Sequence, residues 1–344
     1  MSLATQNTCR KTNMASLGIA FSGGPKPSEI VELVKLSESL GYDSAWAAEG
    51  HGGDQFAILT ACAMQTSTIE LGTAITSIFV RSIPTIAMAA ATVDEISAGR
   101  FILGLGSSHK VQVEPEHGVV YDKPLTRTRE SVDIIRALLR DGEVQHESGT
   151  IRIENFDLWF EPRRADIPIY LAAVFPKMTV ACGEIADGII LTRSTLETAG
   201  EVKQQLAKGA AITGRDANKI AVTSLLPTAV AKTREEALDT MRPGLAFYAG
   251  FFPRYNRLVA EHGFAEEAAT IAAAWKRGDQ AAAIRAVSDK MVDATSVAGT
   301  PEQCRDRLEE YRQSGIDLPI ISPFARGPNS KALFEAAIRA CAPR

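Results

Sequence analysis

Three polar residues of this 344-residue chain have the side chains expected of a proton-transfer site. Glu49 and His51 follow one short apolar run, and His109 follows another. A carboxylate and two histidines that converge could move protons near neutral pH, because an unperturbed histidine titrates near about 6.5. We therefore predict that Glu49, His51 and His109 form the catalytic group.

Each of these three residues also has a purely structural interpretation. Glu49 could cap a helix or form a salt bridge with a neighbouring loop, His51 could be a solvated loop residue, and His109 could hydrogen-bond within its own turn. Neither histidine alone indicates catalysis. Their predicted position on one rim is what favours a functional site.

Residues 98–110, with the sequence AGRFILGLGSSHK, are the most informative stretch. A short apolar strand ends at Gly104 and Gly106, and the chain then becomes polar at once. The hydroxyls of Ser107 and Ser108, beside backbone N–H groups on a tight turn, suit an anion or a planar polar ligand. The alternative is that the two glycines only let the strand end pack beneath a helix.

The elements that must position these residues alternate between short apolar strands and amphipathic helices, which predicts an α/β fold with a parallel sheet. Residues 143–162 interrupt this alternation as a small hairpin, and residues 232–292 form a helical insertion between the seventh and eighth strands. Eight strands favour a closed (β/α)8 TIM barrel over an open doubly wound sheet, and its catalytic groups would follow the strands' carboxyl ends. The predicted strands are residues 17–21, 44–48, 69–76, 100–105, 167–173, 188–191, 220–230 and 318–321.

Several other classes of site are excluded by spacing. His51, His109 and His117 lie on separate predicted loops, so the sequence predicts no metal site. The Gly-x-Ser-x-Gly elbow of a hydrolase triad is missing. The pair Gly104-x-Gly106 lacks the third glycine of a dinucleotide fingerprint, and a polar loop is predicted to follow it.

The overall composition is that of an ordinary globular protein with a small-molecule partner. The net charge of −4 gives no reason to expect nucleic acid or an anionic membrane. The five cysteines are scattered, and no apolar run is long enough for a signal peptide or a membrane span. We expect a cytoplasmic protein with a loose tail over residues 1–15 and a single domain over residues 16–344.

Several longer segments together carry a resemblance to the bacterial luciferase-like oxidoreductases. Within that superfamily the chain is most similar to the branch that uses the deazaflavin coenzyme F-420, which includes methylenetetrahydromethanopterin reductase and a glucose-6-phosphate dehydrogenase. The resemblance extends from residue 17 to about residue 324 and implies a (β/α)8 barrel. The segments are GYDSAWAAEGHGGD, LGTAITSIFVRSIP, AMAAATVDEISAGRFILGLGSSH, PLTRTRESVDIIRALL, IPIYLAAVFPKM, CGEIADGII and GTPEQCRDRLEEYRQSGID.

The resemblance also implies a cofactor site. It places a cis peptide bond between Ala74 and Ile75 behind the central ring of the cofactor, and Glu49 beside that ring. His109 takes the place of an acidic catalytic residue of the sugar-phosphate dehydrogenase. The implied cofactor contacts are Glu49, Ala74, Ile75, Thr76, Ser107, Ser108, Ala172, Ala173, Val174, Phe175 and Arg193.

The chain departs from the family pattern at two places. Many relatives carry a histidine directly after the acid at position 49, where this chain has Gly50, so His51 would have to substitute for it. Some relatives have two glycines near the cofactor phosphate, where this chain has Val174 and Phe175. Arg193 is a candidate counter-charge for that phosphate.

These features predict an oxidoreductase that transfers a hydride between coenzyme F-420 and a small organic substrate, as a homodimer. His109, with His51 or Glu49, would move the accompanying proton. A flavin mononucleotide (FMN) monooxygenase on the same scaffold, and a non-catalytic cofactor-binding protein, remain alternatives. Four aromatic residues of the insertion could form an apolar roof over the site, or equally a helix-packing core or a dimer contact: Phe247, Tyr248, Phe251 and Tyr255.

Overall fold

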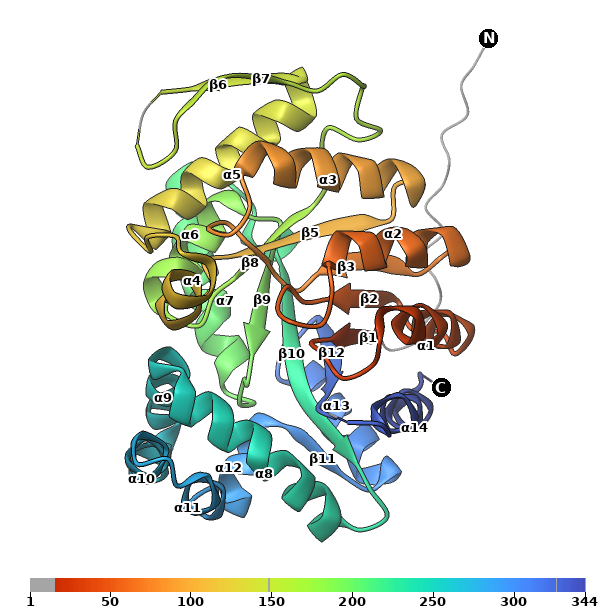
Figure 1. Cartoon of the computed structure of the whole chain (residues 1–344), viewed down its shortest axis with the longest axis vertical. Helices are drawn as coiled ribbons and strands as arrows, with labels where there is room; N and C mark the ends of the chain where they lie inside the picture. Colours follow the sequence, from red (N-terminus) through yellow and green to blue (C-terminus); the bar gives the residue numbers. More distant parts are fainter. Residues whose placement is uncertain (1–15, 148, 326, 344) are drawn as a thin grey trace.

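The computed structural model describes residues 16–147, 149–325 and 327–343, so the predicted tail over residues 1–15 lies outside the described residues. Eight parallel strands close into a barrel, because β10 (Ala221–Val230) pairs with both β12 (Leu318–Pro323) and β9 (Gly188–Thr192), the two ends of the strand order (Figure 1). The predicted (β/α)8 barrel is therefore confirmed. Its strands are β1 (Gly18–Phe21), β2 (Ser44–Ala47), β3 (Glu70–Thr73), β5 (Phe101–Gly106), β8 (Ile169–Ala172), β9 (Gly188–Thr192), β10 (Ala221–Val230) and β12 (Leu318–Pro323).

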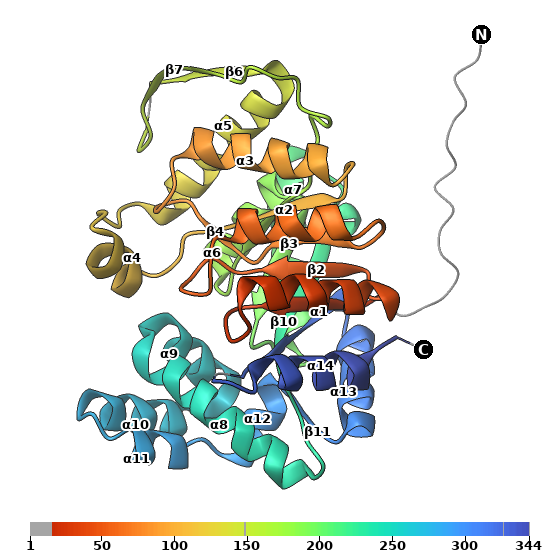
Figure 2. The same cartoon turned by 45° about the vertical axis from the view of Figure 1, so that its right-hand side comes forward.

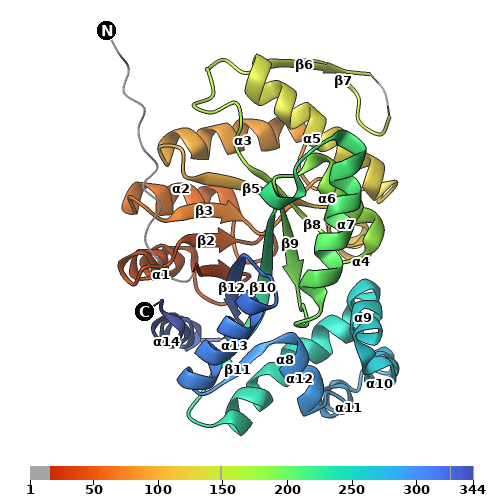
Figure 3. The same ribbon diagram turned by 180° about the vertical axis from the view of Figure 1, so that it is seen from behind.

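Helices cover the outside of the barrel, as Figure 3 shows from behind. Asp54 caps α2 (Gln55–Gln65), since its carboxylate accepts a hydrogen bond from the Ala57 N–H at 3.0 Å. Thr300 and Gln303 form a capping box at the start of α13 (Pro301–Gln313). The covering helices are α1 (Pro27–Ser39), α2 (Gln55–Gln65), α3 (Ile83–Ile96), α5 (Pro124–Asp141), α6 (Pro176–Ile185), α7 (Thr198–Thr213), α13 (Pro301–Gln313) and α14 (Ser330–Cys341).

The single strand predicted over residues 69–76 is interrupted. β3 ends at Thr73, and β4 (Thr76–Ser77) begins three residues later and pairs with the end of β5. The peptide bond between Ala74 and Ile75, inside this interruption, is cis, as the family resemblance implied. The bulge therefore lies at the carboxyl end of the barrel, next to the turn that follows β5.

Two further elements differ from the sequence prediction. The polar loop expected after His109 is instead a short helix, α4 (Lys110–His117), in which only Val113 is buried. One buried apolar residue gives no helical period, so the pattern could not reveal it. The three-residue strand β11 (Val297–Gly299) extends the sheet beside the end of β10 and was also missed. The predicted hairpin is present as antiparallel β6 (Glu143–His146) and β7 (Ile153–Asp157).

The chain between β10 and β12 forms the expected helical insertion, which lies against one side of the barrel (Figure 2). The insertion has a core of its own, which includes Met241, Leu245, Ile271 and Met291. It therefore presents a firmly packed surface to the barrel mouth. Its elements are α8 (Arg234–Phe251), α9 (Pro253–Val259), the π-helical segment η2 (Ala260–Phe264), α10 (Ala265–Lys276), α11 (Gln280–Arg285) and α12 (Asp289–Thr295).

The interior of the barrel is filled by side chains rather than hollow. Trp46 from β2 and Tyr170 from β8 lie with their ring centroids 5.9 Å apart, and the Trp46 indole donates to the Ser44 hydroxyl at 2.8 Å. A Cβ at Gly72 would lie 2.3 Å from the Trp46 ring, so that ring needs a glycine beside it. This packed layer forms the floor beneath the mouth.

We predict that Gly104→Ala will destabilise the barrel by about 3 kcal/mol, because overpacking a filled interior forces the backbone to shift. The added Cβ would lie 1.9 Å from the Thr73 carbonyl oxygen. Urea denaturation would measure the loss. Gly200→Ala in α7 is the control, because nothing lies within 4 Å of its added Cβ, and alanine should stabilise that helix by up to about 1 kcal/mol. Equal stability of the two variants would contradict the packing argument.

Candidate functional site

A cavity of about 550 Å³ lies at the carboxyl ends of the strands, between the barrel mouth and the insertion. Its lining brings together residues that are far apart in the sequence, which is what the barrel prediction required. All but one of the predicted site residues line it: Glu49, His51, Ala74, Ile75, Ser107, Ser108, His109, Ala172, Ala173, Val174, Phe175 and Arg193.

Thr76 is the exception. Its side chain is fully buried, and its hydroxyl accepts a hydrogen bond from the Gln55 amide at 2.8 Å. It anchors β4 to α2 and does not line the cavity. The expected contact of Thr76 with a cofactor therefore has no support in its position.

Both carboxylate oxygens of Glu49 have partners within the protein. One forms an ion pair with Arg81, and the other accepts a hydrogen bond from the Ser77 N–H at 2.8 Å. The Glu49 N–H also donates to the Ile75 carbonyl at 3.3 Å. Glu49 therefore ties the loop after β2 to the cis bulge, and the salt-bridge interpretation left open by the sequence describes it. Arg81, which the sequence did not single out, holds Glu49 in place.

His51 lies on the rim of the cavity, where 78% of its side chain is exposed. Its Nε2 is 3.2 Å from the carboxylate of Glu116 on α4. The helix that the sequence missed thus supplies the partner of His51. His51 and His109 line the same cavity. His51 lies beside α4, whereas His109 packs against the aromatic rings of the insertion.

His109 is half-buried against the insertion, with its ring centroid 4.6 Å from that of Phe252 and 4.9 Å from that of Tyr255. Burial, and then the positive charges of Arg254 and Arg193, lower the pKa of His109 to about 4. The imidazole is therefore neutral at pH 7. In that state one ring nitrogen can donate a hydrogen bond and the other can accept one or take up a proton.

The aromatic residues of the insertion face the same space. Phe247, Tyr248, Phe251, Phe252 and Tyr255 all line the cavity. They also pack on one another, for example Phe247 on Phe251 with ring centroids 5.5 Å apart. These rings therefore form the apolar roof that the sequence allowed, while they also contribute to packing within the insertion.

Two arginines give the cavity its charge. Arg193 is 7% exposed and has a backbone φ of 52°, and its guanidinium carbon lies 3.6 Å from the centroid of the Tyr248 ring. Arg254 on α9 places Nη1 3.4 Å from the Ser107 hydroxyl oxygen. Sequence reasoning missed Arg254, although the aromatic run beside it marked the segment.

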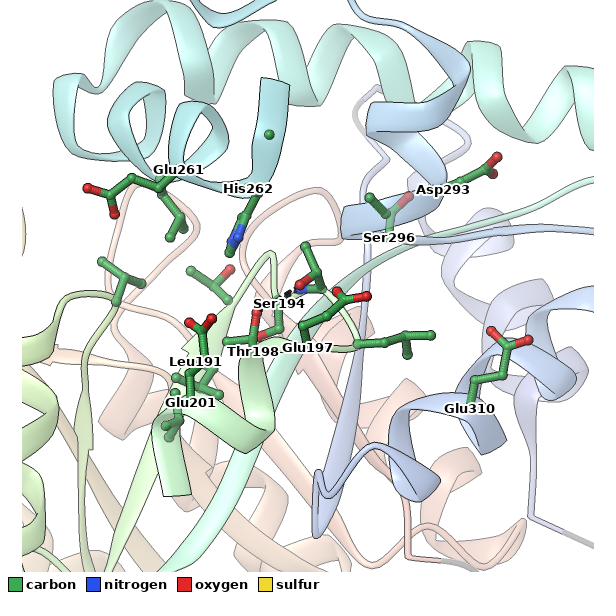
Figure 4. Close-up of a pocket in the computed structure, with 18 of the residues that line it drawn as sticks. Leu191, Ser194, Glu197, Thr198, Glu201, Glu261, His262, Asp293, Ser296 and Glu310 are labelled. Atoms are coloured by element: carbon green, nitrogen blue, oxygen red, sulfur yellow. Dashed lines mark hydrogen bonds between the residues drawn. The ribbon is translucent and has the colours of Figure 1, made fainter. Parts of the chain in front are cut away.

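A second cavity, of about 1100 Å³, adjoins the first and shares Val174, Phe175, Leu191 and Thr192 with it. His262 points from the insertion into this space, opposite Glu197 and Glu201 of the barrel side (Figure 4). Most of its lining residues are polar, and six of them are acidic. Of the predicted site residues, it contains Val174 and Phe175.

Two kinds of feature are missing from the described residues, 16–147, 149–325 and 327–343. Within them, no group of three His, Cys, Asp or Glu side chains is arranged to hold a metal ion. Nor does any helix there combine the length and the apolar character needed to cross a bilayer. The expected cytoplasmic location and homodimer stay predictions.

A parallel barrel with polar groups gathered at its strand ends and a helical insertion beside them is an enzyme-like scaffold. A family model described as luciferase-like monooxygenase matches residues 3–318. The chain therefore belongs to the luciferase-like monooxygenase family, and the resemblance seen in its motifs is confirmed.

Its relatives include reductases that match along nearly their full length. The 5,10-methylenetetrahydromethanopterin reductase of Archaeoglobus fulgidus is 30% identical over 320 residues, which cover 91% of this chain and 95% of that protein. The enzyme of the same name from Methanolobus tindarius is 31% identical, over 92% of this chain and 96% of its own. The solved structure of the coenzyme F-420-dependent tetrahydromethanopterin reductase from Methanopyrus kandleri superposes with a TM-score of 0.82 at 28% identity, covering 95% and 98% of the two chains.

We predict that His109→Gln will reduce the acid sensitivity of the fold. Below pH 6.5 the histidine of the unfolded chain takes up a proton that folded His109 binds only near pH 4, so wild-type stability falls as the pH drops through this window. Between pH 7 and pH 4.5 the wild type should lose about 2 kcal/mol more unfolding free energy than the variant. Urea denaturation at both pH values would measure this, with exposed His117→Gln expected to follow the wild type. The same loss in both variants would contradict the assignment to His109.

Proposed function

We propose that this protein is an oxidoreductase that exchanges a hydride between coenzyme F-420 and a small organic substrate at the barrel mouth. The observation that carries the proposal is the joint placement, around one cavity, of the Ala74–Ile75 bulge, the Ser107 and Ser108 hydroxyls and the His109 imidazole. The named reductases at about 30% identity support the same branch of the family.

The residues present fit a planar, anionic cofactor. The cavity volume of about 550 Å³ lies within the range of about 300–1,000 Å³ that is usual for small-molecule sites. A Cβ at Gly106 would lie 2.7 Å from the Ile75 side chain, so the glycine lets β5 pack closely against the Ala74–Ile75 bulge. Ala74 and Ile75 would back the ring, Ser107 and Ser108 would hydrogen-bond to it or its chain, and the backbone at 172–175 would approach the phosphate.

When bound, the deazaflavin would supply the hydride chemistry. The protein would supply position, exclusion of water and a proton route. The aromatic roof of Phe247, Tyr248, Phe251, Phe252 and Tyr255 would keep bulk water from the reacting carbon. Glu49, held by Arg81, would fix the loop beside the bulge.

His109 is the group that would accept the proton. At pH 7 its imidazole is neutral, because its pKa is lowered to about 4. It can therefore take the proton that leaves a substrate hydroxyl or amine while the hydride leaves the neighbouring carbon. In the opposite direction the same ring would return that proton as the hydride arrives.

The cofactor assignment can be tested by titrating the purified protein with coenzyme F-420 and with FMN. We expect F-420 to bind at least about tenfold more tightly than FMN, a difference of about 1.4 kcal/mol. Changes in visible absorbance would measure both affinities. Tight FMN binding with no affinity for F-420 would instead support the flavin monooxygenase, and binding of neither would contradict both.

The catalytic assignment can be tested with His109→Gln on a panel of small alcohols, ketones and amines. We expect kcat to fall about a hundredfold, since loss of a positioned proton carrier typically costs that much. The F-420 affinity should stay within threefold of the wild type. His117→Gln, an exposed histidine at the end of α4, is the matched control. Unchanged turnover in His109→Gln would remove His109 from the mechanism.

A further inference from the structure

Arg193 and Arg254 enter the mouth cavity without a carboxylate partner. In the described part of the chain neither residue takes part in an ion pair, although arginines such as Arg81 and Arg164 do. The Arg193 Nε is buried and has no hydrogen-bond partner among the residues that the structure describes. A buried guanidinium with an unmade hydrogen bond is costly, so the position indicates a group that binds there.

The two arginines act on the same region of the cavity. Arg193, from the end of β9, lies over Tyr248 and also 5.1 Å from the centroid of the Tyr255 ring. Arg254 comes from α9 in the insertion, and its Nη1 lies 3.5 Å from the Ser108 carbonyl oxygen. Both positive charges act on His109 and on Tyr255. Barrel and insertion thus each contribute one cation to the space around His109.

Each acidic residue that lines this cavity already has a basic side chain beside it. Glu49 is paired with Arg81, and Glu116 lies 3.2 Å from the His51 Nε2. These two are the acids among the lining residues. The arginines therefore leave an uncompensated positive charge beneath an aromatic roof.

Backbone conformation supports a built binding site at this place. Arg193 and Ser108 have φ values of 52° and 54°, a region that residues other than glycine seldom adopt. Such conformations are found preferentially where a ligand is held. Both residues line the cavity at its mouth.

We propose that Arg193 and Arg254 bind an anionic group of the substrate, a carboxylate or a phosphate, so that the substrate is a small anion with an apolar or aromatic body. The inference rests on the proposed function in calling this ligand the substrate. The insertion provides the aromatic surface and Arg254, whereas Arg193 follows barrel strand β9. The family resemblance led us to expect Arg193 at the cofactor phosphate, and the proposal assigns it to the substrate anion instead. A planar guanidinium binds a carboxylate or phosphate through two parallel hydrogen bonds.

The experiment uses benzoate as the probe and benzamide as its neutral counterpart of nearly the same shape. Isothermal titration of the full-length protein, with and without F-420, would measure both affinities. We expect benzoate to bind at least tenfold more tightly than benzamide. Arg193→Gln and Arg254→Gln should each remove most of this preference, and Arg193→Lys should restore only part of it. Arg277→Gln, an exposed arginine of the same insertion, should keep it.

The same variants show whether the two arginines bind an anionic group of the substrate or of the cofactor. Retention of F-420 affinity within threefold, together with loss of the benzoate preference, would support the substrate subsite. Equal binding of benzoate and benzamide to the wild type would overturn it. A tenfold loss of F-420 affinity with the benzoate preference kept would also overturn it, because the arginines would then serve the cofactor.

A different experimental result would show that the proposed function is wrong while the anion subsite is right. If the wild type binds no F-420 but still prefers benzoate, and loses that preference in the variants, the anion subsite stands and the hydride proposal fails. Circular dichroism spectra and thermal melts of each variant would confirm folding. Because Arg254 is only half-buried, Arg254→Gln keeps the test decisive if Arg193→Gln does not fold.

Discussion

The close approach of β3 and β5 is the contact on which the mouth of this barrel depends. The Thr73 hydroxyl donates to the Gly104 carbonyl at 2.8 Å and accepts from the Gly104 N–H at the same distance. This bridge satisfies the Gly104 backbone where the sheet ladder is interrupted. The absence of a side chain at Gly104 lets the two strands meet. The Ala74–Ile75 bulge and the Ser107–Ser108 turn follow directly from these strands, so their relative position is fixed by this contact.

The electrostatics of the cavity come from an uneven pairing of charges. Each of its two acids has a basic partner, Arg81 for Glu49 and His51 for Glu116. Among the described residues Arg193 and Arg254 form no ion pair and lie over the electron-rich faces of tyrosines. The result is a positively charged, half-buried space with a neutral imidazole at its edge. Such a space favours anionic ligands and keeps His109 ready to accept a proton.

The strand and helix pattern was readable because a buried parallel strand is a short apolar run and a covering helix has a regular apolar face. This was enough to predict eight strands, the covering helices, the hairpin and the insertion. The pattern did not predict elements with too few buried apolar residues, namely α4, which has one buried residue, and β11, which has three residues in all. The polar residues at the strand ends could be listed from the sequence because a closed barrel brings those ends to one face.

The sequence by itself thus determined the barrel, the cis bulge by family resemblance and most of the residues at the mouth, because these depend on local periodicity and on motifs within single segments. The tertiary structure alone decided what each of them touches. Glu49 meets Arg81, His51 meets Glu116 on an unpredicted helix, and Arg254 reaches Ser107 from 147 residues further along the chain. Charge pairing and burial depend on distances between segments remote in sequence, and those distances are set only when the barrel closes and the insertion packs over it.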